Sequence, residues 1–314
     1  MPVPVYSVVI PVYNEAGSLR ELHASLTAVM KAAGGGYEII LVDDGSSDES
    51  LAVLKELASS DRALRIISLS RNFGHQAALS AGLDRAAGQA VIFMDADLQH
   101  PPRCIPEMIS RWKQGYEVVG TIRRDPPGAA PLKRYASLLF YKLMDKISDL
   151  HLPAGAADFR LVGPRAAAAL RGMKERSRFF RGLAKWVGYR QCWVEYTAEP
   201  RFSGRSKYSL AKMARLALDG VTSFSTSPLR LSVYLGLACA ALSFAYIIYA
   251  LYIKFVHQAI IGWTSILIAV LFLGGVQLVS IGILGEYIGR LYEEAKGRQL
   301  YLVSEEVGFP EKNA

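Results

Sequence analysis

Five short apolar runs, separated by stretches of mixed polarity, dominate the first 123 residues of the chain. We expect these runs to be strands: Ser7–Val12, Tyr37–Asp44, Leu64–Ser70, Ala90–Asp95 and Glu117–Arg123. We expect helices between them, near residues 15–33, 48–59, 75–87 and 102–114. Because strands this apolar are buried on both faces, the pattern predicts an α/β fold with a Rossmann-like, mostly parallel sheet between helices.

Beyond residue 124 the pattern is less regular. It predicts a helix over residues 131–147 and two more short strands, Ala156–Val162 and Gln191–Tyr196. Residues 207–222 place charged side chains on one helical face and apolar ones on the other. A basic amphipathic helix next to a membrane segment is typical of a helix in the membrane interface, although an ordinary surface helix has the same pattern.

Two long segments near the C-terminus carry no charged side chain. They are residues 231–253 and residues 258–285. Since about 20 apolar residues span the hydrocarbon core of a bilayer as a helix, each segment is long enough to cross a membrane. We expect two transmembrane helices, at about 231–253 and about 263–284.

Basic residues around these segments predict the orientation of the chain. The connection between the spans carries only Lys254 and His257, whereas Arg290, Lys296 and Arg298 follow the second span. By the positive-inside rule, the N-terminal domain and both termini face the cytoplasm at the inner membrane. The expected parts are a cytoplasmic domain (1–206), an interfacial helix (207–228), a region with two spans (229–286) and a cytoplasmic tail (287–314).

Charge and cysteine content narrow the partners and the compartment. The formal net charge of +8 favours an anionic partner, which is a membrane surface, a phosphate-bearing substrate or nucleic acid. Cys104, Cys192 and Cys239 match no metal or redox spacing, which is compatible with a reducing compartment. The sequence contains neither a G-x-G-x-x-G fingerprint nor a P-loop, so a dinucleotide enzyme and a P-loop NTPase are disfavoured. We expect no nucleic-acid partner.

Two carboxylates follow the fourth apolar run, in the sequence Asp-Ala-Asp-Leu-Gln. We expect Asp95 and Asp97, at the end of this strand, to point to the same side, because side chains alternate along a strand. Together with the amide of Gln99 they form an oxygen-rich site that suits Mg²⁺ or Mn²⁺. An EF-hand fits poorly, because His100 and Pro106 stand where its loop needs glycine and glutamate. The alternative is an Asp-rich turn without a metal.

Polar turns also follow the first two expected strands. Tyr13, Asn14 and Glu15 come after the first, and Asp43 and Asp44 end the second. Because the carboxyl ends of parallel strands meet at one edge of a sheet, we expect these groups beside the carboxylate pair. They can hydrogen-bond a base and a ribose there, although each turn alone is also compatible with a capped strand-to-helix connection.

Taken together, these motifs resemble those of the family-2 glycosyltransferases, which have a GT-A fold. Within that family the chain resembles the bacterial GtrB-type bactoprenol glucosyltransferases and, more distantly, the dolichol-phosphate mannose synthases. The Asp-Ala-Asp-Leu-Gln-x-Pro-Pro and Gly-x-Ser-Lys-Tyr elements are specific in combination with two terminal spans. The resemblance covers nearly the whole chain and is carried by Val8–Glu15, Val42–Asp48, Ser70–Gly74, Met94–Pro102, Ala157–Leu161, Arg178–Tyr189, Phe202–Tyr208, Asp219–Pro228 and Leu284–Arg290.

This resemblance implies an inverting transfer of a hexose from a nucleotide sugar to a polyprenyl phosphate. We expect glucose from UDP-glucose and undecaprenyl phosphate as the acceptor, while GDP-mannose, a UDP-N-acetylhexosamine and a UDP-aminoarabinose derivative stay open as donors. The implied nucleotide-sugar residues are Pro11, Tyr13, Asn14, Glu15, Asp44, Gly74, Asp95, Ala96 and Asp97. The implied ligands of a divalent metal (Mg²⁺ or Mn²⁺) are Asp95, Asp97 and Gln99, and the implied acceptor-phosphate residues are Arg123, Arg201 and Lys207.

Asp158 and Asp97 are the implied catalytic residues. Asp158 is the candidate base of the family, but a phosphate acceptor is already anionic near neutral pH and needs positioning more than deprotonation. Asp158 is therefore expected either to orient other groups or to pair structurally with Arg160. Arg123 has the alternative of being a plain surface charge. Arg205 stands where relatives often carry Glu or Gln, which leaves the acceptor loop open.

Two other function classes stay open. A processive polysaccharide synthase is disfavoured, because Gly182-Leu183-Ala184-Lys185-Trp186 occupies the place of its Gln-x-x-Arg-Trp motif and only two spans follow. A catalytically silent, membrane-anchored nucleotide-binding scaffold is the other. The glycines of the second span allow helices to approach closely, so a homo-oligomer is compatible with the sequence, and the family suggests a tetramer.

Overall fold

The computed structural model describes residues 4–124, 153, 155–173, 175–176, 178–197, 227–257 and 262–310. The described residues up to 197, together with 299–310, form one compact unit, and residues 227–298 form a second. Four predictions fall outside the described residues: the helix over 131–147, the amphipathic segment 207–222, Arg201 and Lys207.

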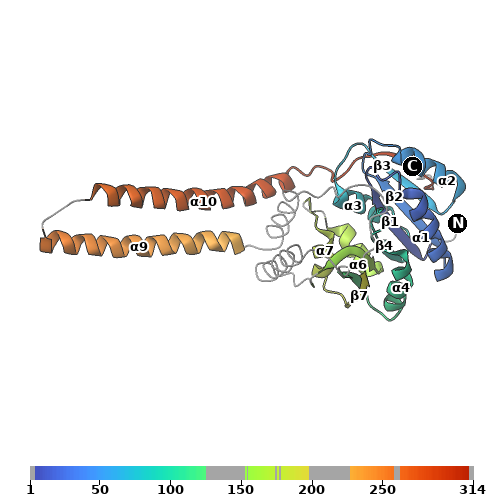
Figure 1. The fold of residues 1–314 in the computed structure, drawn as a ribbon, viewed down its shortest axis with the longest axis horizontal. Coiled ribbons are helices and arrows are strands. Elements are labelled where there is room, and N and C mark those ends of the chain that lie inside the picture. Colours follow the sequence, from blue (N-terminus) through green and yellow to red (C-terminus); the bar gives the residue numbers. More distant parts are fainter. Residues whose placement is uncertain are drawn as a thin grey trace. The chain divides into compact units, whose positions relative to one another are not determined.

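An eight-stranded sheet lies at the centre of the first unit (Figure 1). Its strands are β1 (Tyr6–Val12), β2 (Tyr37–Asp43), β3 (Leu64–Leu69), β4 (Ala90–Phe93), β5 (Val118–Arg124), β6 (Ala156–Val162), β7 (Gln191–Thr197) and β8 (Val303–Val307). They lie in the order β7-β5-β6-β4-β1-β2-β3-β8. The run β4-β1-β2-β3 is parallel, as is β5 with β7, whereas β6 and β8 are antiparallel to their neighbours. The predicted parallel core is confirmed, within a mixed sheet.

Helices cover both faces of this sheet, as the apolar strands require (Figure 1). One face holds α1 (Leu19–Ala33), α2 (Ser50–Ser60) and α4 (Ile105–Lys113), which follows the short 3-10 helix η1 (Pro102–Cys104). The other holds α3 (His75–Arg85), α6 (Pro164–Gly172) and α7 (Phe180–Trp186). The apolar pattern predicts α1 to α4 but misses α6 and α7, which are short and lie beyond the regular first part of the chain.

Helix α3 lies unusually close to β1 and β2. At Gly82 a Cβ atom would lie 2.3 Å from Cγ1 of Val9 and 3.2 Å from Cγ2 of Val42. Most of the buried residues of the helix are small, and at Gly82 its backbone packs almost directly on the sheet. This contact fixes the position of α3, whose first residue is His75.

Strand β8 adds an edge that the sequence pattern does not predict. The chain returns to the first unit after its second long helix and pairs with β3. Lys55 binds Glu305 at 2.6 Å, and Nε of Arg85 donates to Oε1 of Glu306 at 2.8 Å. Two glutamates in five residues break the apolar pattern that is typical of a buried strand. In the fold, each glutamate forms an ion pair with a basic side chain on a neighbouring helix. The strand covers the otherwise open edge of β3.

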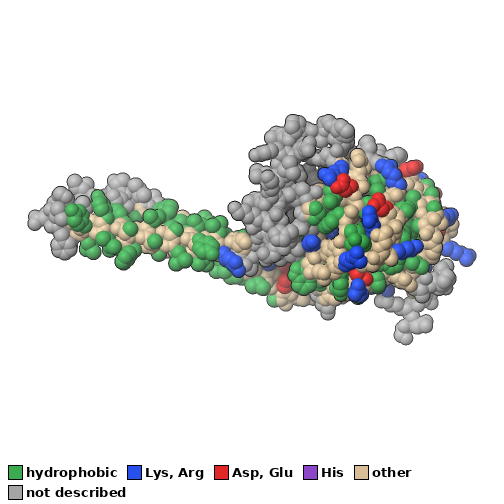
Figure 2. Space-filling view, turned by 90° about the horizontal axis from the view of Figure 1, so that it is seen from below, with side chains coloured by type: hydrophobic (Ala, Val, Ile, Leu, Met, Phe, Trp, Pro, Cys, Tyr) green, Lys and Arg blue, Asp and Glu red, His purple; other side chains and the backbone are tan. Residues whose placement is uncertain are grey.

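The second unit is a pair of long helices, α9 (Ser227–His257) and α10 (Trp263–Ala295). Both predicted spans are therefore confirmed as helices. Among the described residues, the segments long and apolar enough to cross a membrane are Ser227–Tyr249 and Phe272–Ala295. Figure 2 shows that the described surface of this pair is mostly hydrophobic. Such a surface is unfavourable in water and typical of helices in contact with lipid.

Candidate active site

The loops that follow β1 and β2 are joined by hydrogen bonds through Asn14. Its backbone N–H donates to Oγ of Ser46 at 3.0 Å, and its Oδ1 accepts from the backbone N–H of Ser47 at 2.8 Å. Asn14 has a φ of 53°, a left-handed conformation that asparagine tolerates better than most residues. The two polar turns predicted at this edge of the sheet therefore lie side by side.

Asp44 connects the same edge to the loop in front of α3. Its carboxylate accepts the backbone N–H groups of Phe73 at 2.7 Å and Gly74 at 2.9 Å. Burial raises the pKa of Asp44 against the lowering effect of these two hydrogen bonds. Next to it Gly45 has a φ of +66°, and a Cβ there would lie 2.5 Å from the backbone carbon of Arg71. The loops after β2 and β3 are therefore in close backbone contact.

Asp95 and Asp97 lie in a turn, because β4 ends at Phe93. The expectation that strand alternation orients both carboxylates is therefore wrong. The turn is held instead by its own polar contacts: the N–H of Asp95 donates to Nδ1 of His100 at 2.9 Å, and the N–H of Gln99 donates to Oδ1 of Asp97 at 3.1 Å.

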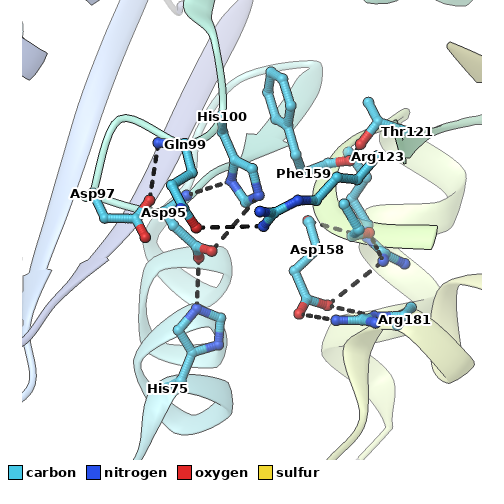
Figure 3. A network of polar contacts seen from close by, with 12 residues as sticks. His75, Asp95, Asp97, Gln99, His100, Thr121, Arg123, Asp158, Phe159 and Arg181 are labelled. Atoms are coloured by element: carbon cyan, nitrogen blue, oxygen red, sulfur yellow. Dashed lines mark hydrogen bonds and ion pairs between the residues drawn. The ribbon is translucent and has the colours of Figure 1, made fainter. Parts of the chain in front are cut away.

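Two histidines face the carboxylate of Asp95 (Figure 3). Nε2 of His75 lies 2.8 Å from Oδ1, and Nε2 of His100 lies 3.7 Å from Oδ2. Burial opposes ionisation of Asp95, but the two histidines outweigh it and lower its pKa to about 2. Asp95 is therefore a carboxylate throughout the neutral pH range.

Asp158, on β6, is held by arginines (Figure 3). Arg181 of α7 donates to both of its oxygens, at 2.6 and 3.2 Å, and Arg160 lies 3.6 Å away. Although burial opposes ionisation, these guanidinium groups hold the pKa of Asp158 well below its usual range. The expected pairing with Arg160 exists, but Arg181 makes the closer contact. A carboxylate held this way is a poor proton acceptor at neutral pH.

Arg123 and Arg124 end β5 and differ in what they contact. Nη1 of Arg123 donates to Oε1 of Gln99 at 3.4 Å, so Arg123 reaches the turn that carries the two aspartates (Figure 3). Arg124 instead forms an exposed ion pair with Glu195. Of the two, Arg123 is therefore the one whose charge faces the site.

The donor set of the Asp95–Asp97 turn suits a divalent cation only in part. Within the described ranges, no group of three or more His, Cys, Asp or Glu side chains is arranged to hold a metal by itself. Two carboxylates are hard ligands of the kind that Mg²⁺ and Mn²⁺ prefer, and both ions commonly complete their shell with phosphate oxygens and water. The oxygen of Gln99 accepts from Arg123, a cation that a metal ion would have to displace. The residues therefore fit a metal that is shared with a bound diphosphate.

Most of the predicted site residues that the structure describes gather at one edge of the sheet. Three residues there were missed: His75, His100 and Arg181. Each stands within or next to a segment that carries the family resemblance, but none has a distinctive spacing to the aspartates it contacts. The contacts of His75 with Asp95 and of Arg181 with Asp158 join different segments of the chain, which no local pattern reveals. His100 lies in the same turn as Asp95, but its contact depends on the shape of that turn.

Comparison with known proteins agrees with this architecture. Residues 7–168 match glycosyl transferase family 2, and residues 227–291 match the GtrB C-terminal hairpin. A glycosyltransferase of Synechocystis, sll0501, is 45% identical over 95% of this chain and 94% of its own. The bactoprenol glucosyl transferase of Shigella phage SfV is 40% identical over 96% of this chain and 98% of its own.

Among solved structures, glucosyl-3-phosphoglycerate synthase from Mycobacterium tuberculosis is similar in fold. Its TM-score is 0.50 at 19% identity, over 70% of this chain and 79% of that protein. Likeness at this level concerns the GT-A fold alone. The family match over half of the chain and the identity to relatives along nearly all of it decide the assignment: the chain belongs to glycosyl transferase family 2 and is a transferase with a GT-A catalytic domain and a GtrB-type C-terminal hairpin.

Proposed function

We propose that this enzyme transfers glucose from UDP-glucose to a polyprenyl phosphate, undecaprenyl phosphate in bacteria, with inversion at the sugar. The observation that carries the proposal is the presence in one chain of a carboxylate-rich sheet edge and a hydrophobic helical hairpin. The 40% identity to bactoprenol glucosyl transferases over nearly the whole length supports both the sugar and the lipid acceptor.

The nucleotide sugar is assigned to the end of β1 and the loops after β1, β2, β3 and β4, at the carboxyl edge where α/β sheets bind ligands. This edge carries Pro11, Tyr13, Asn14, Glu15, Asp44, Gly74, Asp95, Ala96 and Asp97. Asp95 and Asp97 would hold Mg²⁺ or Mn²⁺ together with the diphosphate, and Gln99 would join them only if Arg123 moved. When bound, the cation stabilises the charge that grows on the leaving diphosphate.

The acceptor phosphate is assigned to Arg123, together with Arg201 and Lys207, which lie outside the described residues. The phosphate is anionic before it reacts, so the enzyme's task is to hold it in line with the sugar rather than to deprotonate it. Asp158, ionised and bound to Arg181, fits a positioning role on this side of the site. Cations around the acceptor also offset repulsion between its phosphate and the donor's diphosphate.

Membrane attachment follows from the nature of the two substrates. A nucleotide sugar is soluble, whereas a polyprenyl chain stays in the bilayer. Two spans keep the enzyme at the membrane that contains its acceptor. We place the catalytic domain and both termini on the cytoplasmic side of the inner membrane, where nucleotide sugars are made and where the basic flanks of the spans belong.

The direct test is transfer by the purified protein in vesicles that contain polyprenyl phosphate. With radiolabelled UDP-glucose and Mg²⁺, the label should move into the lipid extract, and Asp97→Asn should abolish the transfer. GDP-mannose, UDP-N-acetylhexosamines and a UDP-aminoarabinose derivative are compared in the same assay, and faster transfer from one of them would overturn the glucose assignment. Long polymeric products would indicate a processive synthase, and the absence of turnover with every donor would favour a silent scaffold.

A further inference from the structure

His75, the first residue of α3, is engaged through both nitrogens of its ring. Nε2 lies 2.8 Å from Oδ1 of Asp95, and Nδ1 lies 3.2 Å from Nε2 of Gln76 (Figure 3 shows the first contact). Gln76 is oriented by its other end, because its Oε1 accepts the backbone N–H of Phe180 at 2.9 Å. The amide nitrogen of Gln76 therefore faces His75 and donates to Nδ1. This leaves the ring proton on Nε2, where it points at Asp95.

Asp95 depends on this contact more than an aspartate in a strand would. It lies past the end of β4, so the sheet does not fix the direction of its side chain. Nε2 of His100 is 3.7 Å from the carboxylate, which is too far for a hydrogen bond. Among the described residues, His75 is the side chain that donates a hydrogen bond to Asp95.

The support behind His75 is rigid. Helix α3 packs on the sheet through Gly82, and the loop before it is held by Asp44. Phe180, which orients Gln76, begins α7, and the next residue, Arg181, binds Asp158. Carboxylates that bind a metal are themselves hydrogen-bonded by neighbouring groups that set their direction, and His75 is placed to do this for Asp95.

We propose that His75, which is oriented by its hydrogen bond with Gln76, is a positioning residue that directs Asp95 toward the metal and diphosphate of the donor. The inference rests on the proposed function, since it assumes that Asp95 acts there. Without His75 the carboxylate can rotate away, which weakens the shared metal site and slows transfer. Binding of UDP without metal changes little, because it depends on the loops after β1 and β2.

The test compares three variants in the full-length protein. His75→Leu removes the donor, His75→Gln keeps an amide N–H near the position of Nε2, and His23→Leu removes a matched pair outside the site. His23 contacts Asp61 through Nε2 at 2.9 Å, a geometry close to that of His75 and Asp95. The readouts are kcat, KM for UDP-glucose, the Mg²⁺ concentration that gives half-maximal rate, the calorimetric Kd of UDP with and without Mg²⁺, and Tm.

We expect His75→Leu to lower kcat and to raise the half-saturating Mg²⁺ concentration, each by roughly 10- to 100-fold. The Kd of UDP without metal should stay within about twofold of wild type, because no contact to the nucleotide is lost. His75→Gln should recover most of both losses. His23→Leu should lower Tm and leave kcat unchanged.

Two results would overturn the inference: wild-type kcat and Mg²⁺ dependence in His75→Leu, or a His75→Gln variant that folds but is as defective as His75→Leu. If His75→Leu does not fold, His75→Asn replaces it, because its shorter amide reaches no further than Nδ1. Failure of the proposed function looks different. The wild type would then transfer no sugar. The effect of Mg²⁺ on the Kd of UDP could still be measured in His75→Leu and in wild type, and would test the role of His75 by itself.

Discussion

Asp158 illustrates how neighbouring charges limit what a single residue can do. Two guanidinium groups keep it ionised and weaken it as a base. The reaction does not need a base, since the acceptor phosphate is already charged. The carboxylate instead holds Arg181, and with it the start of α7, beside β6.

Replacement of Asp158 by asparagine should therefore lower kcat without changing the shape of the pH–rate profile between about pH 6 and about pH 9. A profile that loses its acidic limb would instead identify Asp158 as the base. The control is Asp61→Asn, which breaks a carboxylate–histidine pair outside the site and should leave kcat unaltered.

The same substitution should change stability in a defined pH window. Because the pKa of Asp158 is lowered in the folded state, its stabilisation is complete above the ordinary aspartate pKa and fades as the pH falls below it. We expect Asp158→Asn to cost about 1–3 kcal/mol of unfolding free energy at neutral pH. Denaturation in detergent should show this gap unchanged down to about pH 5 and shrinking only below about pH 4. A gap that grows on acidification would contradict this.

Gly45 offers a second test at the residue scale. Ala at this position would strain a left-handed backbone and press against Arg71, so Gly45→Ala should destabilise the protein by about 1–3 kcal/mol and weaken UDP binding. Gly34 is the matched control, because it has a similar φ of +70° and a Cβ added there would meet nothing within 4 Å. Thermal unfolding of both variants gives the comparison, and equal losses would mean that the contact with Arg71 is unimportant.

At the scale of elements, β8 makes the chain's C-terminal segment part of the catalytic sheet. Its two glutamates have different surroundings. Arg85 and Glu306 are about a quarter exposed and make several contacts, whereas Lys55 and Glu305 are nearly half exposed. Partly buried ion pairs with bidentate geometry interact more strongly than exposed ion pairs.

A double-mutant cycle with Arg85→Met and Glu306→Gln should therefore give a coupling energy of about 1 kcal/mol. The parallel cycle with Lys55→Met and Glu305→Gln should give a value close to zero. Both cycles are measured by denaturation of the full-length protein in detergent. A larger coupling for the exposed pair would show that β8 is not held as described.

The elements that the sequence predicts well are those with an unbroken apolar signal. β1 to β4 are almost entirely buried, and the two long helices are apolar over more than 20 residues, so composition alone reveals them. The sequence does not predict β8, because two of its five residues are glutamates, which pair with cations on α2 and α3. It does not predict α6 and α7, because each helix is short. At the site, the sequence motif identifies Asp95 and Asp97, but it does not reveal the turn, which is held by local polar contacts, or the contact with His75, which comes from a different segment of the chain.

At the scale of the whole molecule, the position of β8 constrains how the chain crosses the membrane. β3 precedes both spans and β8 follows them, yet the two strands pair in one sheet. A chain that enters the bilayer through α9 must return through α10 to make that pairing. This supports the proposal that the catalytic domain and the C-terminus share one side.

Labelling of introduced cysteines tests that topology. Gln258, between the two spans, and Ser304, exposed on β8, are each changed to cysteine. In intact cells a membrane-impermeant maleimide should label Gln258→Cys but not Ser304→Cys, and lysis should make both reactive. The wild type, which carries three native cysteines, gives the background. Labelling of Ser304→Cys in intact cells would reverse the assigned orientation.

The central claim is a single inverting displacement by polyprenyl phosphate on UDP-glucose. It is tested most directly by NMR determination of the anomeric configuration of the glucosyl lipid made from UDP-α-glucose. We predict a polyprenyl phosphate that carries β-linked glucose. An α-linked product, or the absence of a glucosyl lipid when the wild type is supplied with UDP-glucose, Mg²⁺ and polyprenyl phosphate, would contradict the account.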